Sequence, residues 1–474
     1  MALTDPGSFR GSPPAQPPWA LYVPQGPALW GPKPWTLGSP VRPRSSLQAP
    51  GLSTQPRSVS GRIWSQGGAG FEQFEGFGGA VTEAAAYNYS LMSPEQKRQL
   101  IHTYFSPEEM NYRLVRVHMD SCDASLGMYE AVSDPEDTEL KSFSFARTEK
   151  YILPMLRDIQ AERKGDLQLM LSPWSPPAFM KTNGQRCHGG KLKPEYRAMW
   201  AGILCRYVRE FQARGFQVQR ISIQNEANAV QTWDSCLYSA EDEKVFLRDF
   251  LRPEMQRQGL GEVEVFIWDH NKERLFERVR DTVDDSTRDM VAGAAFHWYS
   301  GDHFENLDLV KRLYPNMKLI LSESCLEYRI IEGNAIEEAG LRLCHEYVQD
   351  LSHGTQAFYD WNLLLDERGG PNHVNNLCHA AFLYHTKTGE LMPQKILDYL
   401  SALSRAVRPG SRRILFSGFS DRFEVAAFRT GDREVTALVL NRSDKLSPIN
   451  LRMHGKGGAA ILPPKTLGVF VVEE

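Results

Sequence analysis

Beginning near residue 70, short apolar segments alternate regularly with longer amphipathic ones. Apolar runs rich in β-branched and aromatic residues are typical of strands, and segments with charges along one side are typical of helices. Eight such strand-then-helix units follow one another over roughly 310 residues, which predicts an α/β fold with a (β/α)8 TIM barrel. The expected strands are Glu75–Ala80, Arg113–Met119, Leu167–Pro173, Val218–Gln224, Val263–Trp268, Ala292–Trp298, Lys318–Ser322 and Thr355–Asp360. The expected helices are Pro94–Tyr104, Ala146–Gln160, Pro194–Ala213, Ala240–Gln258, Leu275–Asp281, Leu307–Leu313, Glu337–Val348 and Asn375–His385.

After Pro393 the pattern changes to short segments in which apolar and polar residues alternate, with turns between them. Strands at this spacing are typical of an antiparallel sandwich, and Ser58–Trp64 is expected to add one further strand to it. We therefore divide the chain into a leader (1–58), a strand that joins the β domain (59–70), a TIM-barrel catalytic domain (71–392) and a C-terminal antiparallel β-sandwich domain (393–474). The expected C-terminal strands are Ile414–Gly418, Phe423–Arg429, Glu434–Asn441, Ile449–Met453, Ala459–Leu462 and Leu467–Val472.

The first 58 residues hold 13 of the 29 prolines and a single acidic residue, Asp5. Such a segment buries too little apolar surface to offset the entropy of ordering it, so we expect a disordered leader. The segment lacks the continuous apolar region of a secretory signal peptide. The seven cysteines form no C-x-x-C pair, which indicates neither a disulfide framework nor a zinc site. We therefore expect a reducing, cytoplasmic location.

Charge and hydropathy exclude two classes of partner. The net charge is −4 with a sequence pI near 6.3, so the chain lacks the basic field that nucleic-acid binding needs. No run of 18 or more apolar residues occurs, so we expect no stable insertion into a membrane.

Two of the expected barrel strands end in a glutamate. The segment V-Q-R-I-S-I-Q-N-E leads to Glu226 at the fourth strand, and K-L-I-L-S-E leads to Glu323 at the seventh. In a TIM barrel the C-terminal strand ends meet at one mouth, where the chemistry occurs. A pair of carboxylates at that mouth is the minimal equipment of a retaining glycoside hydrolase.

Polar and aromatic side chains follow several other expected strands. A sugar offers an apolar C–H face and a ring of hydroxyls, so aromatic rings beside carboxylates and amides suit a carbohydrate site. Structural roles compete with binding roles here: Arg116 is expected to be a buried partner of a carboxylate, Asp120 serves equally well as a turn cap, and His297 alone would be a core residue. The residues concerned are Arg116, Asp120, Asp123, Trp174, His297, Tyr299, Trp361, Asn362 and Asn376.

Seven of these segments, in order along the chain, resemble glycoside hydrolase family 30, and within it the glucosylceramidase (glucocerebrosidase) branch. The similarity extends from about residue 74 to the C-terminus. It implies a (β/α)8 barrel with a side β-sandwich and retaining hydrolysis of a β-glycoside. The segments are G-F-G-G-A-V-T-E-A-A-A, R-V-H-M-D-S-C-D, S-P-W-S-P-P-A-F-M-K-T-N, Q-N-E, F-H-W-Y, S-E-S-C and D-W-N-L followed by G-G-P-N.

The resemblance also implies residue roles. Glu226 matches the acid/base, Glu323 the nucleophile, and Asn225 the residue that hydrogen-bonds the 2-hydroxyl of the sugar. The other matches lie around the glycone or hold the carboxylates: Asp123, Trp174, Tyr299, Trp361, Asn376 and Arg116, with His297 as a further binding candidate. The chain departs from the family at Ala227, where proline usually follows the acid/base, and at His373, where an aromatic residue is common.

We therefore expect a retaining β-glycosidase acting on β-glucosides, glycolipids among them, with no metal or organic cofactor because two carboxyl groups supply acid, base and nucleophile. A β-1,6-glucanase, β-xylosidase or β-fucosidase of the same family is the first alternative. A carbohydrate-binding protein that has lost the chemistry is the second. The sequence alone fixes neither the aglycone nor the oligomeric state.

Overall fold

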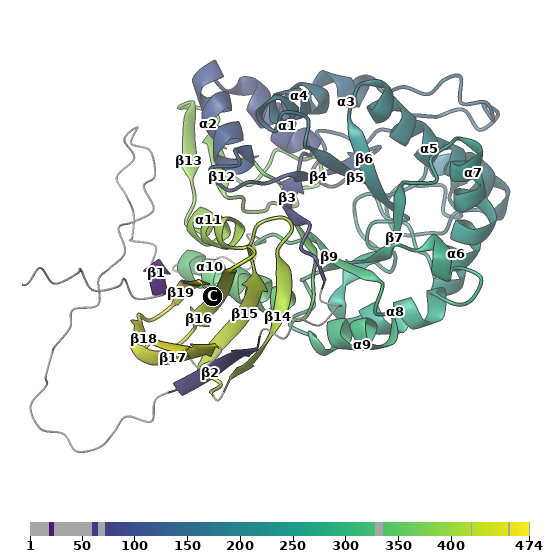
Figure 1. Cartoon of the computed structure of the whole chain (residues 1–474). Coiled ribbons are helices and arrows are strands. Elements are labelled where there is room, and N and C mark those ends of the chain that lie inside the picture. Colours follow the sequence, from purple (N-terminus) through teal and green to yellow (C-terminus); the bar gives the residue numbers. More distant parts are fainter. Residues whose placement is uncertain are drawn as a thin grey trace, which may run out of the picture.

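The computed structural model describes residues 19–22, 59–64, 72–327, 335–418, 420–453 and 456–473. Within these residues the chain forms a closed eight-stranded barrel, a mostly antiparallel eight-stranded sheet built largely from the C-terminal strands, and a small three-stranded sheet (Figure 1). Most of the expected leader lies outside the described residues; within it the structure places one strand, β1 (Trp19–Tyr22), which pairs with the last strand of the chain.

The barrel confirms the predicted (β/α)8 fold. Its neighbouring strands are parallel and each pairs with the next along the chain, until the eighth closes the ring by pairing with the first. All eight predicted strands are found, and the fifth barrel strand, β7, continues to Asn271, beyond the expected end at Trp268. The strands are β3 (Gly76–Ala80), β4 (Leu114–Met119), β5 (Gln168–Pro173), β6 (Gln217–Ser222), β7 (Glu264–Asn271), β8 (Gly293–His297), β9 (Lys318–Glu323) and β10 (Ala357–Asp360).

Helices between these strands cover the outside of the barrel and bury their apolar sides against it. Capping residues begin several of them: Thr82 accepts from Ala85 N–H at the start of α1, and Ser93 and Gln96 form a capping box at the start of α2. The helices are α1 (Glu83–Leu91), α2 (Pro94–Phe105), α3 (Ala146–Lys150), α4 (Ile152–Glu162), α5 (Arg197–Ala213), α6 (Ala240–Phe246), α7 (Arg252–Arg257), α8 (Leu275–Thr282), α9 (Glu305–Leu313), α10 (Ala335–Ser352) and α11 (Ile396–Ala406).

The prediction of a helix at Asn375–His385 is wrong. Its C-terminal part is the strand β12 (Phe382–His385), which pairs with β11 (Leu365–Asp366) and β13 (Glu390–Pro393). A short apolar run has no hydrophobic periodicity that distinguishes a helix from a strand. Here the run forms a strand because it can pair with β13. The helix that completes the eighth unit is α11, which lies beyond the expected barrel boundary at residue 392.

The C-terminal strands form the predicted β domain. Strand β14 (Arg412–Gly418) belongs to both of its layers, because Arg412–Ile414 pair with β15 and Leu415–Gly418 pair with β2 (Val59–Trp64). Strand β2, from the region just before the barrel, therefore lies inside the C-terminal domain. The other strands are β15 (Phe423–Arg429), β16 (Glu434–Asn441), β17 (Ser447–Met453), β18 (Lys456–Leu462) and β19 (Thr466–Glu473).

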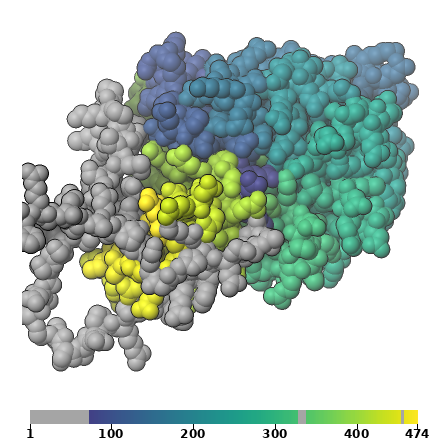
Figure 2. Space-filling model, viewed as in Figure 1, coloured from purple at the N-terminus to yellow at the C-terminus, as the bar shows by residue number. Residues whose placement is uncertain are grey.

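The two domains share one hydrophobic core. Phe428 of β15, Leu438 of β16 and Val469 of β19 belong to the same buried cluster as the barrel helices α10 and α11. Figure 2 shows the C-terminal residues, in yellow and light green, packed directly against the barrel. Among the described residues, no helix has the length and apolar character needed to cross a membrane.

Candidate active site

A pocket of about 330 Å³ opens at the C-terminal ends of the barrel strands. This is the end of the barrel at which parallel strands present their terminal side chains to a common space. The volume suits one sugar ring with part of its neighbour. The pocket is lined by Asp123, Trp174, Asn225, Glu226, Gln231, Trp233, His270, Asn271, Tyr299, Glu323, Cys325, Glu327, Trp361, Asn376 and Cys378.

Arg116, on β4, is the fully buried cation beneath the pocket. Its guanidinium donates to Glu323 Oε2 at 2.7 Å and to Asp269 Oδ2 at 2.8 Å, so it binds two carboxylates at once. It also donates to Asn225 Oδ1 at 2.8 Å. Because a buried guanidinium stays charged, these contacts hold three side chains in place and favour ionised carboxylates.

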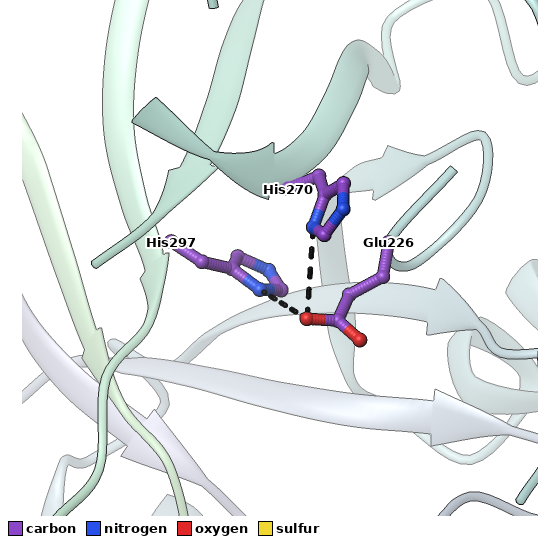
Figure 3. A group of neighbouring side chains, drawn as sticks. All are labelled: Glu226, His270 and His297. Carbon is purple, nitrogen blue, oxygen red and sulfur yellow. Dashed lines mark ion pairs between the residues drawn. The ribbon is translucent and has the colours of Figure 1, made fainter. Parts of the chain in front are cut away.

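Glu226 follows β6, and a backbone hydrogen bond to β7 fixes its position. Its N–H donates to the carbonyl of Asp269 at 2.7 Å, and its φ of 49° is unusual for a residue with a side chain. The carboxylate Oε1 lies 3.5 Å from His297 Nδ1 and 3.6 Å from His270 Nδ1, and Figure 3 shows both imidazoles directed at this one oxygen. Gln231 reaches the other oxygen, Oε2, at 3.5 Å.

Glu323 ends β9 and has different partners. Besides Arg116, the hydroxyl of Tyr299 donates to its Oε1 at 3.0 Å. His297 Nδ1 lies 3.9 Å from the same oxygen. One imidazole nitrogen is therefore within 4 Å of both Glu226 and Glu323, so the two carboxylates approach each other across the pocket floor.

Two indole rings form one wall of the pocket. Trp174 and Trp361 stack with centroids 5.3 Å apart and an interplanar angle of 22°, and the guanidinium of Arg116 lies 4.9 Å from the centroid of Trp174. Beside them, Asn376 donates to Asp123 Oδ2 at 3.0 Å, and the Asp123 carboxylate lines the pocket, where its other oxygen can accept from a bound hydroxyl. The pocket thus combines an aromatic surface with acceptors, as sugar recognition requires.

Several residues at the mouth have a left-handed backbone. Asp120, Glu226, Trp268, Asp269 and Asn362 have φ between 47° and 74°. Such conformations cost about 1–3 kcal/mol each for residues with a side chain and persist where the surrounding contacts fix them, often at functional sites. Because these residues lie at or near the ends of β4, β6, β7 and β10, they indicate that the functional site is at this end of the barrel.

The charges of the site shift its pKa values in opposite directions. Burial raises the pKa of Glu226, but the neighbouring imidazoles of His270 and His297 outweigh burial and lower that pKa below the ordinary value. Burial raises the pKa of Glu323 despite the opposing charges of His297 and Arg116. Although burial lowers the pKa of His297, the carboxylates Glu323, Asp269 and Glu226 raise it to about 9. The opposite shifts of Glu226 and His297 therefore favour the proton they share lying on the imidazole.

Asp123 and Asp269 differ in the same way. Burial, followed by the charge of Glu323, raises the pKa of Asp123 to about 7. Burial also acts to raise the pKa of Asp269, but the charge of Arg116 and the contact with His297 hold it well below its usual range. Asp269 is thus a permanent anion, whereas Asp123 changes its charge near neutral pH.

The structure brings all ten residues of the predicted site together. Eight line the pocket, whereas Arg116 and His297 are fully buried behind it and act through the carboxylates that they contact. Asp120, the alternative candidate, lies outside the pocket lining: it accepts from Tyr207 and Ala131 and faces Arg186, so its role is structural.

Sequence reasoning missed Asp269, which joins Arg116 to His297 through contacts of 2.8 and 3.1 Å. The segment W-D-H-N at the end of β7 carried the signal, since polar residues follow an apolar run there as they do at β6 and β9. The strand was expected to end at Trp268, so Asp269 and His270 were not predicted to be site residues. Also missed were His270, Asn271, Gln231, Trp233, Cys325, Glu327 and Cys378.

Known proteins match this chain along both domains. The glycosyl hydrolase family 30 TIM-barrel domain matches residues 74–407, and the glycosyl hydrolase family 30 beta sandwich domain matches residues 410–468. The lysosomal acid glucosylceramidase of Mus musculus is 27% identical over a 399-residue alignment that covers 80% of this chain and 77% of that protein. The endo-1,6-beta-D-glucanase of Neurospora crassa is 24% identical over a 261-residue alignment that covers 53% of each chain.

A solved structure agrees with these matches. SrfJ from Salmonella typhimurium superposes with a TM-score of 0.84 and 36% identity, covering 89% of this chain and 94% of that chain. The family matches span both domains, and the two glutamates lie at the strand ends where the family's barrel presents its chemistry. This chain is therefore a glycoside hydrolase of family 30.

Proposed function

We propose that the protein is a retaining β-glycosidase that hydrolyses β-glucosides in the manner of a glucosylceramidase, with Glu226 as acid/base and Glu323 as nucleophile. The observation that carries this proposal is the unequal environment of two carboxylates that share one pocket. Glu323 is bound by a cation and a phenol, whereas Glu226 faces two imidazoles. Unequal environments are how a pair of identical side chains takes different roles.

In the first step, Glu323 attacks the anomeric carbon and Glu226 protonates the leaving oxygen. Arg116 and Tyr299 stabilise the ionised form of Glu323 that must attack. Because burial raises the pKa of Glu323, ionisation of this group should set the acidic limb of the activity profile above the ordinary value for glutamate.

The proton for the leaving group is held by the pair formed by Glu226 and His297. At rest it lies on His297, 3.5 Å from Glu226 Oε1, and it moves to Glu226 as the substrate excludes water. Since one proton belongs to both groups, the alkaline limb should report the pair rather than either residue. After the glycosyl-enzyme forms, Glu226 accepts a proton from the attacking water, and the cycle closes.

Asp123 and Asn225 hold the sugar. Asp123 Oδ1 accepts from a glycone hydroxyl, and the amide nitrogen of Asn225 is free to donate to the 2-hydroxyl because its oxygen is bound by Arg116. The stacked indoles of Trp174 and Trp361 cover the apolar face of the ring.

Product stereochemistry tests the proposal. Proton NMR of the first-formed sugar from 4-nitrophenyl β-D-glucoside should show the β-anomer, because double displacement inverts the anomeric carbon twice. An initial α-anomer would refute Glu323 as nucleophile, and no turnover of any β-glycoside would favour the non-catalytic carbohydrate-binding alternative.

The β-1,6-glucanase alternative is favoured by one feature. Trp233, Gln231 and Glu327 line the same pocket, and Gln231 reaches Glu226 Oε2 at 3.5 Å. An indole with polar neighbours suits a second sugar as well as a lipid. The Neurospora crassa relative is named for activity on such linkages. Rates on glucosylceramide, pustulan, and the 4-nitrophenyl β-glucoside, β-xyloside and β-fucoside decide between these substrates. A kcat/KM for pustulan exceeding that for glucosylceramide would replace the first assignment.

A further inference from the structure

Three side chains, a glutamate and two histidines, converge at the proposed acid/base. His270 Nδ1 and His297 Nδ1 point at the same oxygen of Glu226, and the three atoms lie within 4.8 Å of one another (Figure 3). The side chain of His270 is 11% exposed and that of His297 is fully buried. Neither Nδ1 has a hydrogen-bond partner within the described parts of the chain. Two buried lone-pair donors are thus aimed into one small space beside a carboxylate.

This donor set is that of a transition-metal site. Two imidazole nitrogens and one carboxylate oxygen bind Zn²⁺ in catalytic sites that leave a fourth position open. With metal–ligand bonds of about 2.0–2.1 Å, tetrahedral ligand atoms lie about 3.3–3.4 Å apart. The distances from Glu226 Oε1 are 3.5 Å to His297 and 3.6 Å to His270, close to the tetrahedral value, and all three ligand atoms lie within 4.8 Å of one another, so the two imidazoles need only turn toward a common point. The pocket supplies the open fourth position.

Asp269 prepares one of the ligands. Its Oδ1 lies 3.1 Å from His297 Nε2, so in the neutral ring the proton sits on Nε2 and the lone pair on Nδ1. Carboxylates that orient metal-binding histidines in this way are a general feature of metal sites. Asp269 is itself fixed by Arg116 at 2.8 Å and by Ser322 at 2.6 Å.

We propose that Glu226, His270 and His297 bind a divalent transition-metal ion, with Zn²⁺ the best fit, and that this ion inhibits the enzyme. A metal-bound Glu226 can neither give a proton to the leaving oxygen nor accept one from water. The ion displaces the proton otherwise held by His297, which passes to the buffer. The binding claim stands on geometry alone, whereas the inhibition rests on the proposed function of Glu226.

Isothermal titration of the full chain with ZnCl₂ tests the binding. At pH 8, where protons compete less for the imidazoles, we expect one strong site per chain. His270→Asn and Glu226→Gln each remove one ligand and should weaken binding at least tenfold. The matched control is His102→Asn, which removes an exposed histidine that lies 2.9 Å from Glu162 and should leave binding unchanged. Far-UV circular dichroism confirms that each variant is folded, and either ligand variant suffices if the other does not fold.

Two outcomes overturn the proposal: no strong binding to the unaltered chain, or binding that both ligand variants retain. The second result would place the ion elsewhere, with the thiols of Cys325 and Cys378 in the same pocket as the first candidates. A Co²⁺ titration identifies that case by its thiolate charge-transfer absorption, which a site of histidine and glutamate lacks.

Turnover of 4-nitrophenyl β-D-glucoside tests the inhibition. Zn²⁺ should inhibit with a constant matching the calorimetric Kd, and EDTA should restore activity. Binding with unchanged turnover would refute the inhibition while leaving the site intact. If the chain hydrolyses no glycoside, the proposed function fails, yet the calorimetric result still decides the metal site.

Discussion

At the scale of the residue, the two glutamates are distinguished by their neighbours rather than by their positions. Glu226 and Glu323 both follow buried strands, both line the pocket, and both approach His297. Only Glu323 contacts Arg116 and Tyr299, and only Glu226 contacts His270 and Gln231. If their roles are as proposed, removing each should have a different chemical consequence.

Azide rescue exposes that difference. In Glu226→Ala the first step with a 2,4-dinitrophenyl leaving group needs little protonation, so the glycosyl-enzyme still forms and azide should release it as the β-glycosyl azide. In Glu323→Ala no covalent intermediate forms, so turnover should vanish with every leaving group and azide should give the α-product. NMR identifies the products, and the unaltered enzyme with azide is the control. Exchanged anomers would mean exchanged roles.

Replacing Asp123 should lower the activity of the enzyme but raise its free energy of unfolding. Burial and the charge of Glu323 raise its pKa from 3.8 to about 7, so the folded state binds its proton more tightly than the unfolded state does. The ionised form therefore destabilises the fold: the effect is absent below about pH 4, grows as pH rises, and is complete above pH 7. Asp123→Asn removes it and should raise the free energy of unfolding at pH 8 by as much as about 4 kcal/mol.

The same substitution should reduce kcat/KM at least tenfold, because an acceptor for a sugar hydroxyl is lost in a closed pocket. Urea unfolding at pH 4.5 and pH 8 measures the stability, where only the second should show the full gain. Asp285→Asn, at a fully exposed side chain, is the control and should change neither quantity. A gain equal at both pH values would contradict the linkage.

At the scale of the element, the strand β3 packs so closely against β4 that one of its positions admits only glycine. A Cβ on Gly78 would lie 1.9 Å from the carbonyl oxygen of Leu114 and 2.5 Å from its carbon, on the neighbouring strand β4. Because backbone atoms cannot move aside, any side chain at this position separates the two strands that begin the barrel.

Gly78→Ala should therefore destabilise the protein by roughly 3 kcal/mol or more and reduce its soluble yield. The matched control is Gly261→Ala, where the added Cβ meets no atom within 4 Å. Thermal unfolding followed by circular dichroism compares the two. A melting temperature for Gly78→Ala equal to that of the control would show that β3 and β4 adjust freely.

The sequence predicts helices and strands well where the hydrophobic pattern is long or repeated. It predicts them poorly where pairing with a distant strand determines the structure. All eight barrel strands and both glutamates were predictable, since each buried run ends in polar residues. The helix expected at Asn375–His385 failed because β12 is determined by its partner β13, which no local pattern reveals. Asp269 and His270 were missed because the irregular pairing between Trp268 and His270 extends β7 beyond its apolar run.

At the scale of the whole molecule, the β domain is part of the barrel's core rather than an appendage. Phe428 of β15 lies 6.3 Å, centroid to centroid, from Phe74 just before β3, in an edge-on arrangement. Across the same boundary, Glu424 of β15 contacts His345 of α10 at 2.7 Å, and within the β domain it also accepts from Arg442 at 2.8 Å. Because apolar and charged contacts both cross the boundary, neither domain can lose its structure without exposing the core of the other.

The chain should therefore unfold in one cooperative transition. Phe428→Ala removes a ring that is 1% exposed and should cost about 3–5 kcal/mol, which for a core of this size lowers the melting temperature by roughly 5 °C. Scanning calorimetry should show one peak shifted as a whole, and glycosidase activity should be lost at the same lower temperature. Leu415→Ala is the control, because that side chain in the neighbouring strand β14 is 52% exposed and contributes little. Two peaks, of which only one moves, would mean that the barrel folds independently of the β domain and that the shared core does not couple them.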